Sequence, residues 1–142
     1  MHEVFDEVLT DFPGDVAWPG TDDGDLHVHA AAVHAGSTML LTSDSGLLAL
    51  RGLADGVPYE PIHPDEFFCL LDDSNERQVQ EMTRRQLAHY AARNQPAELA
   101  DRLRRAQCPH FADRVEERIA QLAGPRAHRR FLQQKRSAST QA

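Results

Sequence analysis

The sequence predicts an α/β fold in its first half, followed by a helical C-terminal extension. Residues 26–35 are rich in alanine and are followed by Gly36, which is typical of a helix and its C-terminal cap. The run TMLLT at 38–42 is apolar throughout and bounded by turn residues, which suits a strand buried on both faces of a short parallel sheet. At 142 residues, one domain with a single core is expected.

Three further elements are expected in the first half. Apolar residues at helical spacing predict a short helix over residues 3–12, which the Pro, Gly and Asp residues after it should end. A short helix is expected at 47–53. The segment GVPYEPI at 56–62 contains two prolines and is expected to form a peripheral strand, because proline removes a donor from the sheet.

The second half is expected to be mostly helical. Pro64, with Asp65 and Glu66 directly after it, is typical of a helix start. Further helices are expected at 76–93, 97–106 and 111–122. The tail from residue 125 to 142 has five basic residues and no acidic ones, and it should be disordered at its end.

Charge is distributed very unevenly along the chain. Residues 1–76 carry 16 acidic residues and one basic residue, whereas residues 77–142 carry six acidic and 14 basic residues. Such asymmetry often marks contact with nucleic acid or another anionic ligand, although arginine-rich helices are also commonly just solvated surfaces. The candidate nucleic-acid contacts are Arg84, Arg85, Arg102, Arg104 and Arg105.

The sequence lacks the features of a membrane or exported protein. No stretch approaches the roughly 20 apolar residues that cross a bilayer, and the first residues are acidic rather than a basic start followed by an apolar run. A soluble, cytoplasmic protein without membrane contact is expected.

The helix–strand pair at 26–42 places an acidic residue at each end. A ten-residue helix and a five-residue strand are both about 15 Å long, because their rises per residue are about 1.5 and 3.3 Å. With a tight reversal at Gly36, Asp25 and Asp44 should return to the edge beyond the carboxyl end of the strand, where open α/β sheets bind ligands. Two carboxylates there could share Mg²⁺ or Mn²⁺.

Each candidate ligand also has a purely structural interpretation. Asp25 is the natural N-cap of the helix after it, worth about 1 kcal/mol, and Asp44 suits a turn or the cap of the next helix. His27, His29 and His34 lie on the same helix as possible ligands, but scattered histidines more often form surface or interhelical hydrogen bonds.

Three stretches of the sequence together resemble a known family. DLHVHAAAVHAGSTMLLTSDSGLL resembles the second half of a PIN domain, and VPYEPIHPDEFFCLLDD looks like its edge strand and following helix. QPAELADRLRRAQCPHFADRV is similar to the helical extension of one subgroup of PIN proteins, the VapC-like ribonuclease toxins. The resemblance covers about residues 22 to 122.

The resemblance implies a fold and a domain organisation. The fold would be a partial PIN-like three-layer α/β structure with a short parallel sheet, followed by the helical extension. Residues 1–76 would form the C-terminal part of a PIN-like domain, residues 77–124 the extension, and residues 125–142 a basic, disordered tail.

The resemblance also implies an activity, that of an Mg²⁺- or Mn²⁺-dependent endoribonuclease with four acidic ligands. By motif, Asp25 matches the third acidic residue and Asp44 the fourth. The chain departs from the family pattern before Asp25, where no strand ends in a first catalytic Asp and no helix supplies the second acidic residue. The N-terminal half of the domain is thus expected to be missing, and the chain alone is expected to be weak or inactive.

Two functions follow as alternatives. The first is a PIN-type ribonuclease, the toxin of a toxin–antitoxin pair, with RNA and an antitoxin as partners. The edge of the sheet that the missing N-terminal strand leaves open would be covered by a complementing half-domain, a second copy of the chain in a homodimer, or the N-terminal segment. The second is a non-catalytic binding or assembly module that contacts nucleic acid or a protein through the arginine-rich helices.

Overall fold

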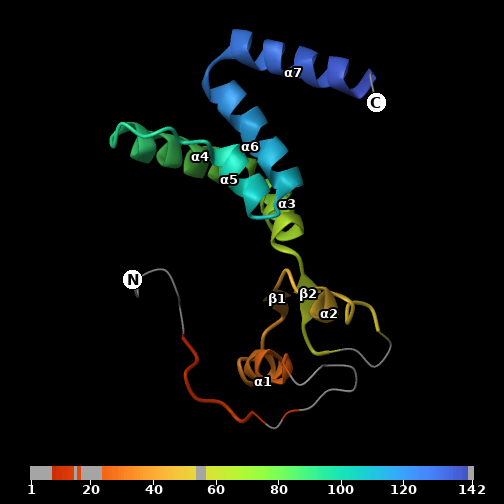
Figure 1. The fold of residues 1–142 in the computed structure, drawn as a ribbon. Coiled ribbons are helices and arrows are strands. Elements are labelled where there is room, and N and C mark those ends of the chain that lie inside the picture. Colours follow the sequence, from red (N-terminus) through yellow and green to blue (C-terminus); the bar gives the residue numbers. More distant parts are fainter. Residues whose placement is uncertain (1–7, 15, 17–23, 54–56, 141–142) are drawn as a thin grey trace. The chain divides into compact units, whose positions relative to one another are not determined.

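The computed structural model describes residues 8–14, 16, 24–53 and 57–140. The chain divides into two compact units, residues 1–64 and 65–142, which we call unit 1 and unit 2. The described residues are mixed α/β, mostly helical, with a short two-stranded parallel sheet in unit 1 (Figure 1). No helix in these ranges is long and apolar enough to cross a membrane.

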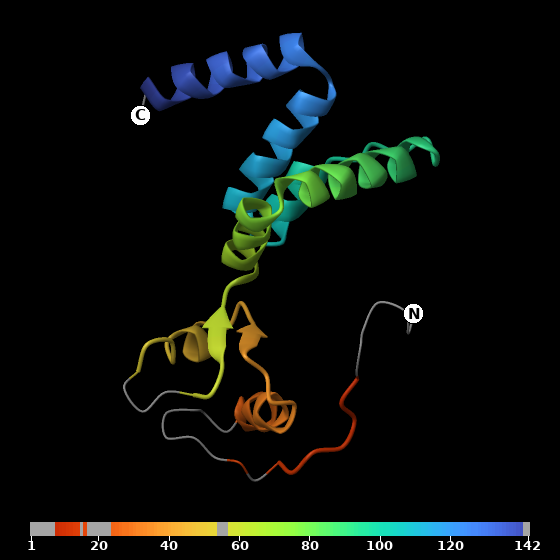
Figure 2. The same cartoon turned by 180° about the vertical axis from the view of Figure 1, so that it is seen from behind.

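Unit 1 is built around a helix, two strands and a short connecting helix. Its elements in chain order are α1 (Leu26–His34), β1 (Met39–Leu41), α2 (Ser45–Leu48) and β2 (Glu60–Ile62). The two strands lie side by side in both views (Figures 1 and 2) and pair in parallel, with Leu40 opposite Pro61. The buried apolar residues of this unit are Ala30, Ala32, Leu47, Leu50, Tyr59, Pro61 and Ile62.

The reversal between α1 and β1 occurs at Gly36, as the sequence predicts. The N–H of Gly36 donates to the carbonyl of Val33, and the N–H of Ser37 donates to the carbonyl of Ala32, both at 3.0 Å. Gly36 has a φ of 61°, a conformation that costs other residues more than glycine. A glycine at this position therefore lets the strand turn back directly from the end of the helix.

Unit 1 differs from the sequence expectations in three places. The short helix expected at 47–53 instead spans Ser45–Leu48. Residues 8–12 of the predicted helix over 3–12 are not helical, and its other residues lie outside the described ranges. The strand β1, predicted to be buried on both faces, is exposed on one. The side chains of Met39 and Leu41 share this face, which the described residues leave open. Met39 is 43% exposed and Leu41 is 44% exposed. The sequence could not reveal that this face is uncovered.

Unit 2 is helical. It contains α3 (Pro64–Ser74, whose first residue belongs to unit 1), α4 (Glu76–Ala91), α5 (Leu99–Arg105), α6 (Pro109–Leu122) and α7 (Pro125–Thr140). The helix α6 contacts α4, α5 and α7. The first four of these helices confirm the helices expected from the sequence to within a few residues.

The last helix, α7, corrects the expectation of a disordered basic tail over residues 125–142. The composition of the tail suggested disorder, but Ala127, Phe131 and Ala138 recur at helical spacing. These three residues face Ile119 and Ala120 of α6. Ala127 and Phe131 are half-buried there, and packing of an apolar stripe against a neighbouring helix is what stabilises most helices in proteins.

The helix α3 belongs with the helical unit rather than with the sheet, although the sequence placed the boundary after residue 76. Two buried carboxylates of α3 explain this, because both bind α6. Asp65 accepts hydrogen bonds from the N–H groups of Phe111 and His110, at 2.8 and 3.2 Å, and so caps the start of α6. Burial on its own raises the pKa of Asp65, but these hydrogen bonds and one from the His110 ring outweigh it, and the pKa lies below its usual value.

The second carboxylate, Asp72, is only 2% exposed and lies between two guanidinium groups of α6. The Nη2 and Nε of Arg118 donate to its two oxygens at 3.1 and 3.2 Å, and the Nη1 of Arg114 donates to it at 3.2 Å. Arg114 also binds the exposed Asp73, and Arg118 binds Glu76. The charge of Asp72 is thereby compensated by side chains of the protein.

We expect Asp72→Ala to lower the free energy of unfolding by about 3 kcal/mol, because it leaves two partly buried guanidinium groups without their central partner. Asp73→Ala is a matched control, since it removes a neighbouring carboxylate bound to the same Arg114 but exposed to solvent, and should cost less than about 1 kcal/mol. Urea denaturation of the full chain measures both. Equal losses for the two variants would contradict this account.

Candidate functional site

Asp25 and Asp44 lie on the same side of Gly46 in unit 1. A Cβ atom placed on Gly46 would lie 3.1 Å from Oδ1 of Asp44 and 3.8 Å from Oδ2 of Asp25. The two carboxylates therefore come close together although they are distant in the sequence. The absence of a side chain at Gly46 leaves the space between them open.

The two carboxylates are held in different ways. Asp44 is the N-cap of α2, and its Oδ1 accepts a hydrogen bond of 3.0 Å from the N–H of Leu47. Asp25 occupies the N-cap position of α1, where its backbone carbonyl accepts from Val28 and His29, but its side chain makes no capping hydrogen bond. Asp44 therefore caps its helix through its side chain, as the sequence predicts. Asp25 occupies the N-cap position of α1, but its carboxylate does not cap the helix.

A buried histidine–tyrosine pair lies next to Asp25. Nδ1 of His29 on α1 and the hydroxyl of Tyr59 are 3.0 Å apart, and both residues are 4% exposed. Burial lowers the pKa of His29. Burial, and to a smaller extent the negative charge of Asp25, raises the pKa of Tyr59. The imidazole of His29 and the hydroxyl of Tyr59 are therefore both neutral near pH 7. Of the three helix histidines, His29 thus makes a hydrogen bond within the fold, while His27 and His34 are not buried.

The donor set around Gly46 suits a hydrated hard cation better than a closed metal cage. Mg²⁺ commonly keeps several waters and is bound through one or two carboxylates, which is what Asp25 and Asp44 offer. Among the described residues there is no group of three or more His, Cys, Asp or Glu side chains able to hold a metal. The residues present therefore fit a loosely held Mg²⁺ or Mn²⁺ and not a structural zinc.

The structure separates the five arginines predicted to contact nucleic acid. Arg104 donates to Glu116 and Asp113 of α6, both at 2.8 Å, and so joins α5 to α6. Arg84 and Arg85 both bind Glu81 at 2.8 Å.

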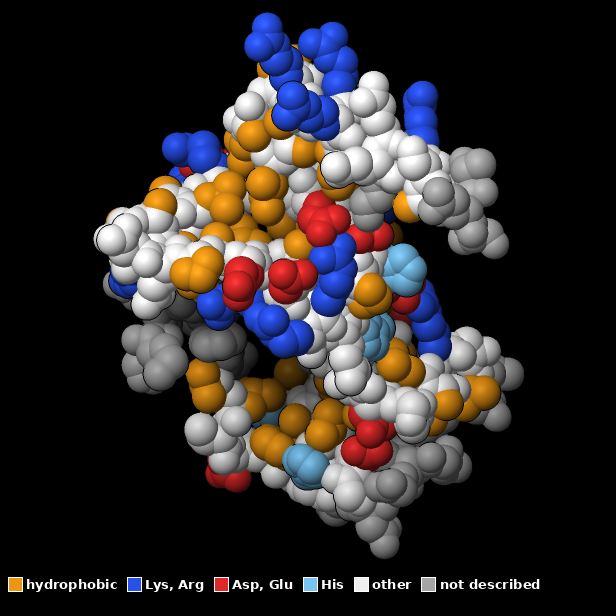
Figure 3. Space-filling view, turned by 45° about the horizontal axis from the view of Figure 1, so that its top comes forward, with side chains coloured by type: hydrophobic (Ala, Val, Ile, Leu, Met, Phe, Trp, Pro, Cys, Tyr) orange, Lys and Arg blue, Asp and Glu red, His pale blue; other side chains and the backbone are white. Residues whose placement is uncertain are grey.

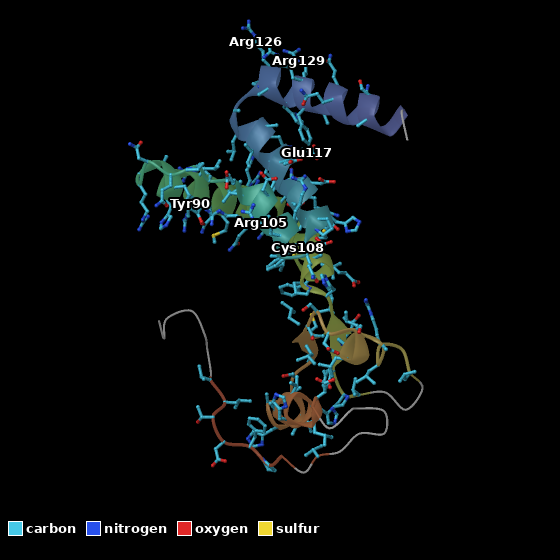
Figure 4. All side chains as sticks on the ribbon, in the orientation of Figure 1. Tyr90, Arg105, Cys108, Glu117, Arg126 and Arg129 are labelled. Atoms are coloured by element: carbon cyan, nitrogen blue, oxygen red, sulfur yellow. The ribbon has the colours of Figure 1, made fainter. Side chains whose placement is uncertain are left out.

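The other two predicted arginines, Arg102 and Arg105, lie on α5. The guanidinium of Arg102 lies over the ring of Tyr90, with 4.9 Å between its carbon and the ring centroid. Arg105 is exposed and makes no ion pair with any described residue. Figure 4 shows Arg105 and Tyr90 in this part of unit 2. Only Arg105 of the five has neither an acidic nor an aromatic partner among the described residues.

The sequence interpretation passed over a cationic surface on α7. Arg126, Arg129 and Arg130 are exposed and make no ion pair within the described ranges. Figure 4 shows Arg126 and Arg129 pointing away from α6, and Figure 3 shows Lys and Arg side chains gathered at the top of its view. The signal in the sequence is the presence of five basic and no acidic residues after residue 124.

Part of the chain matches a known protein family. Residues 64–117 match the family model described as VapC50 C-terminal domain, and this range covers α3, α4, α5 and most of α6. The match begins within one residue of the start of unit 2. These residues are therefore similar to the C-terminal domain of VapC50.

Comparisons with curated proteins and with solved structures gave no match.

The lowered pKa of His29 has a consequence for stability. In the unfolded chain His29 binds a proton near the ordinary pKa of 6.5, whereas in the folded chain it does so only at lower pH. The free energy of unfolding should therefore fall as the pH drops below about 6.5 towards the pKa of the folded state. His29→Gln should weaken this dependence. Tyr59→Phe keeps the imidazole and should preserve it, while costing about 1 kcal/mol at every pH through the lost hydrogen bond.

Denaturation at several pH values between 5 and 8 measures these effects. If His29→Gln and the unaltered chain lose stability with the same slope below pH 6.5, the assignment of the proton to His29 is wrong.

Proposed function

We propose that the chain acts in a PIN-type, metal-dependent ribonuclease, the toxin of a toxin–antitoxin pair. Asp25 and Asp44 would be two of its acidic metal ligands. The observation that carries the proposal is the approach of these two carboxylates to one point beside Gly46. The match of residues 64–117 to the VapC50 C-terminal domain supports the family to which the activity is assigned.

The residues of the chain would contribute in distinct ways. Asp44 uses Oδ1 for the cap of α2, which holds its carboxylate in one orientation, while Oδ2 has no hydrogen bond to a described residue. Asp25 is fixed at the start of α1, beside the buried Tyr59. The carboxylate of Asp44 is thus held before any ligand arrives, which lowers the entropic cost of binding. A bound Mg²⁺ or Mn²⁺ would activate a water and neutralise charge on the phosphoryl oxygens.

Two carboxylates hold Mg²⁺ weakly, and a loosely held ion is poorly fixed against a scissile phosphate. The two further acidic ligands expected from the family would come from a complementing half-domain or from a second copy of the chain. The open face of β1, with Met39 and Leu41 exposed, is a surface on which such a partner could pack.

RNA would contact the chain mainly through cations that are not already neutralised. Arg126, Arg129 and Arg130 on α7 and Arg105 on α5 meet this condition among the described residues. Arg104 does not, because Asp113 and Glu116 already surround its guanidinium. The electrostatic part of RNA binding is thus assigned mainly to α7.

The metal site is tested with Asp25→Asn and Asp44→Asn. Asparagine also caps helices, so Asp44→Asn should keep α2 while losing a charged metal ligand. Mn²⁺ bound to the full chain, followed by electron paramagnetic resonance, should weaken at least about tenfold in each variant. Asp101→Asn, which removes an exposed carboxylate on α5, should bind Mn²⁺ as the unaltered chain does.

The same variants are assayed for divalent-dependent RNA cleavage, with and without a complementing PIN half-domain. Cleavage that survives Asp44→Asn unchanged would contradict the nuclease assignment, as would Mn²⁺ binding that neither substitution affects.

The RNA surface is tested with the triple variant Arg126→Gln, Arg129→Gln, Arg130→Gln. Each lost phosphate contact should reduce the slope of log affinity against log salt, so the triple variant should lower the magnitude of the slope by about 2 for single-stranded RNA. Arg84→Gln is the control, because Arg84 is already paired with Glu81 and should alter the slope little. Fluorescence anisotropy over a salt series measures both. Equal slopes for the triple variant and the unaltered chain would show that α7 does not contact the RNA.

One observation favours a second function, that of a non-catalytic binding or assembly module. The described residues contain no cluster of three or more metal-ligating side chains. In that case cleavage would be absent at every concentration of Mg²⁺ or Mn²⁺, even with a complementing half-domain, while binding of RNA or of a protein partner persisted and depended on the arginines of α7.

A further inference from the structure

Unit 2 contains an apolar groove of about 880 Å³ formed by α3, α4, α5 and α6. Its floor and walls include Val79, Met82, Leu99, Leu103, Phe111 and Val115. Two of its wall residues are unusually exposed for apolar side chains, since Leu71 is 44% and Met82 49% accessible to solvent. Exposed, contiguous apolar surface of this kind commonly marks an interaction site.

The groove has the length and composition of a helix-binding site. The residues that α4 contributes recur at helical spacing from Asn75 to Gln86, and at about 1.5 Å per residue this stripe is about 16 Å long. That length accommodates about three turns of a second helix. Met82, at the edge of the groove, is flexible and polarisable, and methionine is common on surfaces that accept an apolar helix face.

The charge around the groove is mainly positive. No acidic residue lines it, and its single charged lining residue is Arg102. Arg77 and Arg85 border its outer edge on α4, together with Glu81, which is itself paired with Arg84 and Arg85. The rim is therefore net positive and complementary to an acidic partner.

We propose that this groove binds an amphipathic helix of another polypeptide, with an apolar face seated between α4 and α5 and acidic residues along its flanks. The apolar face would cover Met82 and Leu103, and the acidic flanks would meet Arg77 and Arg102. The groove lies wholly within residues 68–115, and the proposal depends on neither the metal site nor nuclease activity.

The test uses the full chain and three fluorescein-labelled peptides of about four helical turns. The first has a leucine face with glutamate flanks, the second the same face with lysine flanks, and the third the composition of the first in scrambled order. We expect saturable binding of the glutamate-flanked helix, with the lysine-flanked and scrambled peptides at least about tenfold weaker by anisotropy.

Two sets of variants locate the binding surface. Met82→Asp should weaken the glutamate-flanked helix at least about tenfold, whereas Leu132→Asp, at an exposed apolar residue of α7, should not. Both side chains are partly exposed, and circular dichroism checks that both variants fold. The double variant Arg77→Glu, Arg85→Glu should reverse the preference in favour of the lysine-flanked peptide, while Arg129→Glu, Arg130→Glu on α7 should leave it unchanged.

The proposal is overturned if the glutamate-flanked helix does not bind, or binds equally well to Met82→Asp. It is also overturned if single-stranded RNA displaces the peptide in a Met82-dependent manner, which would make the groove a nucleic-acid site. Sedimentation that shows a dimer of the unaltered chain and a monomer of Met82→Asp would assign the groove to a second copy instead.

Discussion

The organisation of unit 2 depends on the burial of one carboxylate, that of Asp72, between Arg114 and Arg118. A charge that is 2% exposed is tolerated only with full compensation, so α3 and α6 must lie at the one separation that lets both guanidinium groups reach it. Asp65 is a second attachment of α3 to α6. It lies about 11 Å from Asp72 along the axis of α3, because a helix rises about 1.5 Å per residue. Two attachments fix both position and direction, and they set the walls of the apolar groove.

Unit 1 depends on a different constraint, the tight reversal of the chain between α1 and β1. Because Gly36 reverses the chain without a loop, the two ends of the helix–strand pair meet again, and Asp25 and Asp44 arrive beside Gly46. This geometry could be predicted from the sequence, since it needs only the rises of a helix and a strand and a glycine at the turn. Pro64 likewise predicted the start of α3, because proline at a first helical position acts locally.

The features that the sequence did not reveal all depend on partners distant along the chain. Arg104 looks like a free cation until α6 places Asp113 and Glu116 beside it. The helix α7 looks like a polar tail until Ile119 offers it a surface. The exposure of Met39 and the groove beside Met82 are likewise properties of packing, and no local pattern encodes which faces stay uncovered.

The pairing of Arg104 also affects how genetic data on this chain should be interpreted. A screen that scores toxicity or binding would register an Arg104 substitution as a loss, and its position in a basic helix would invite the conclusion that it touches the target. Since its guanidinium joins α5 to α6, the same phenotype follows from a loosened helix pair and lower protein abundance. Steady-state protein level therefore has to be measured beside every phenotype at this position.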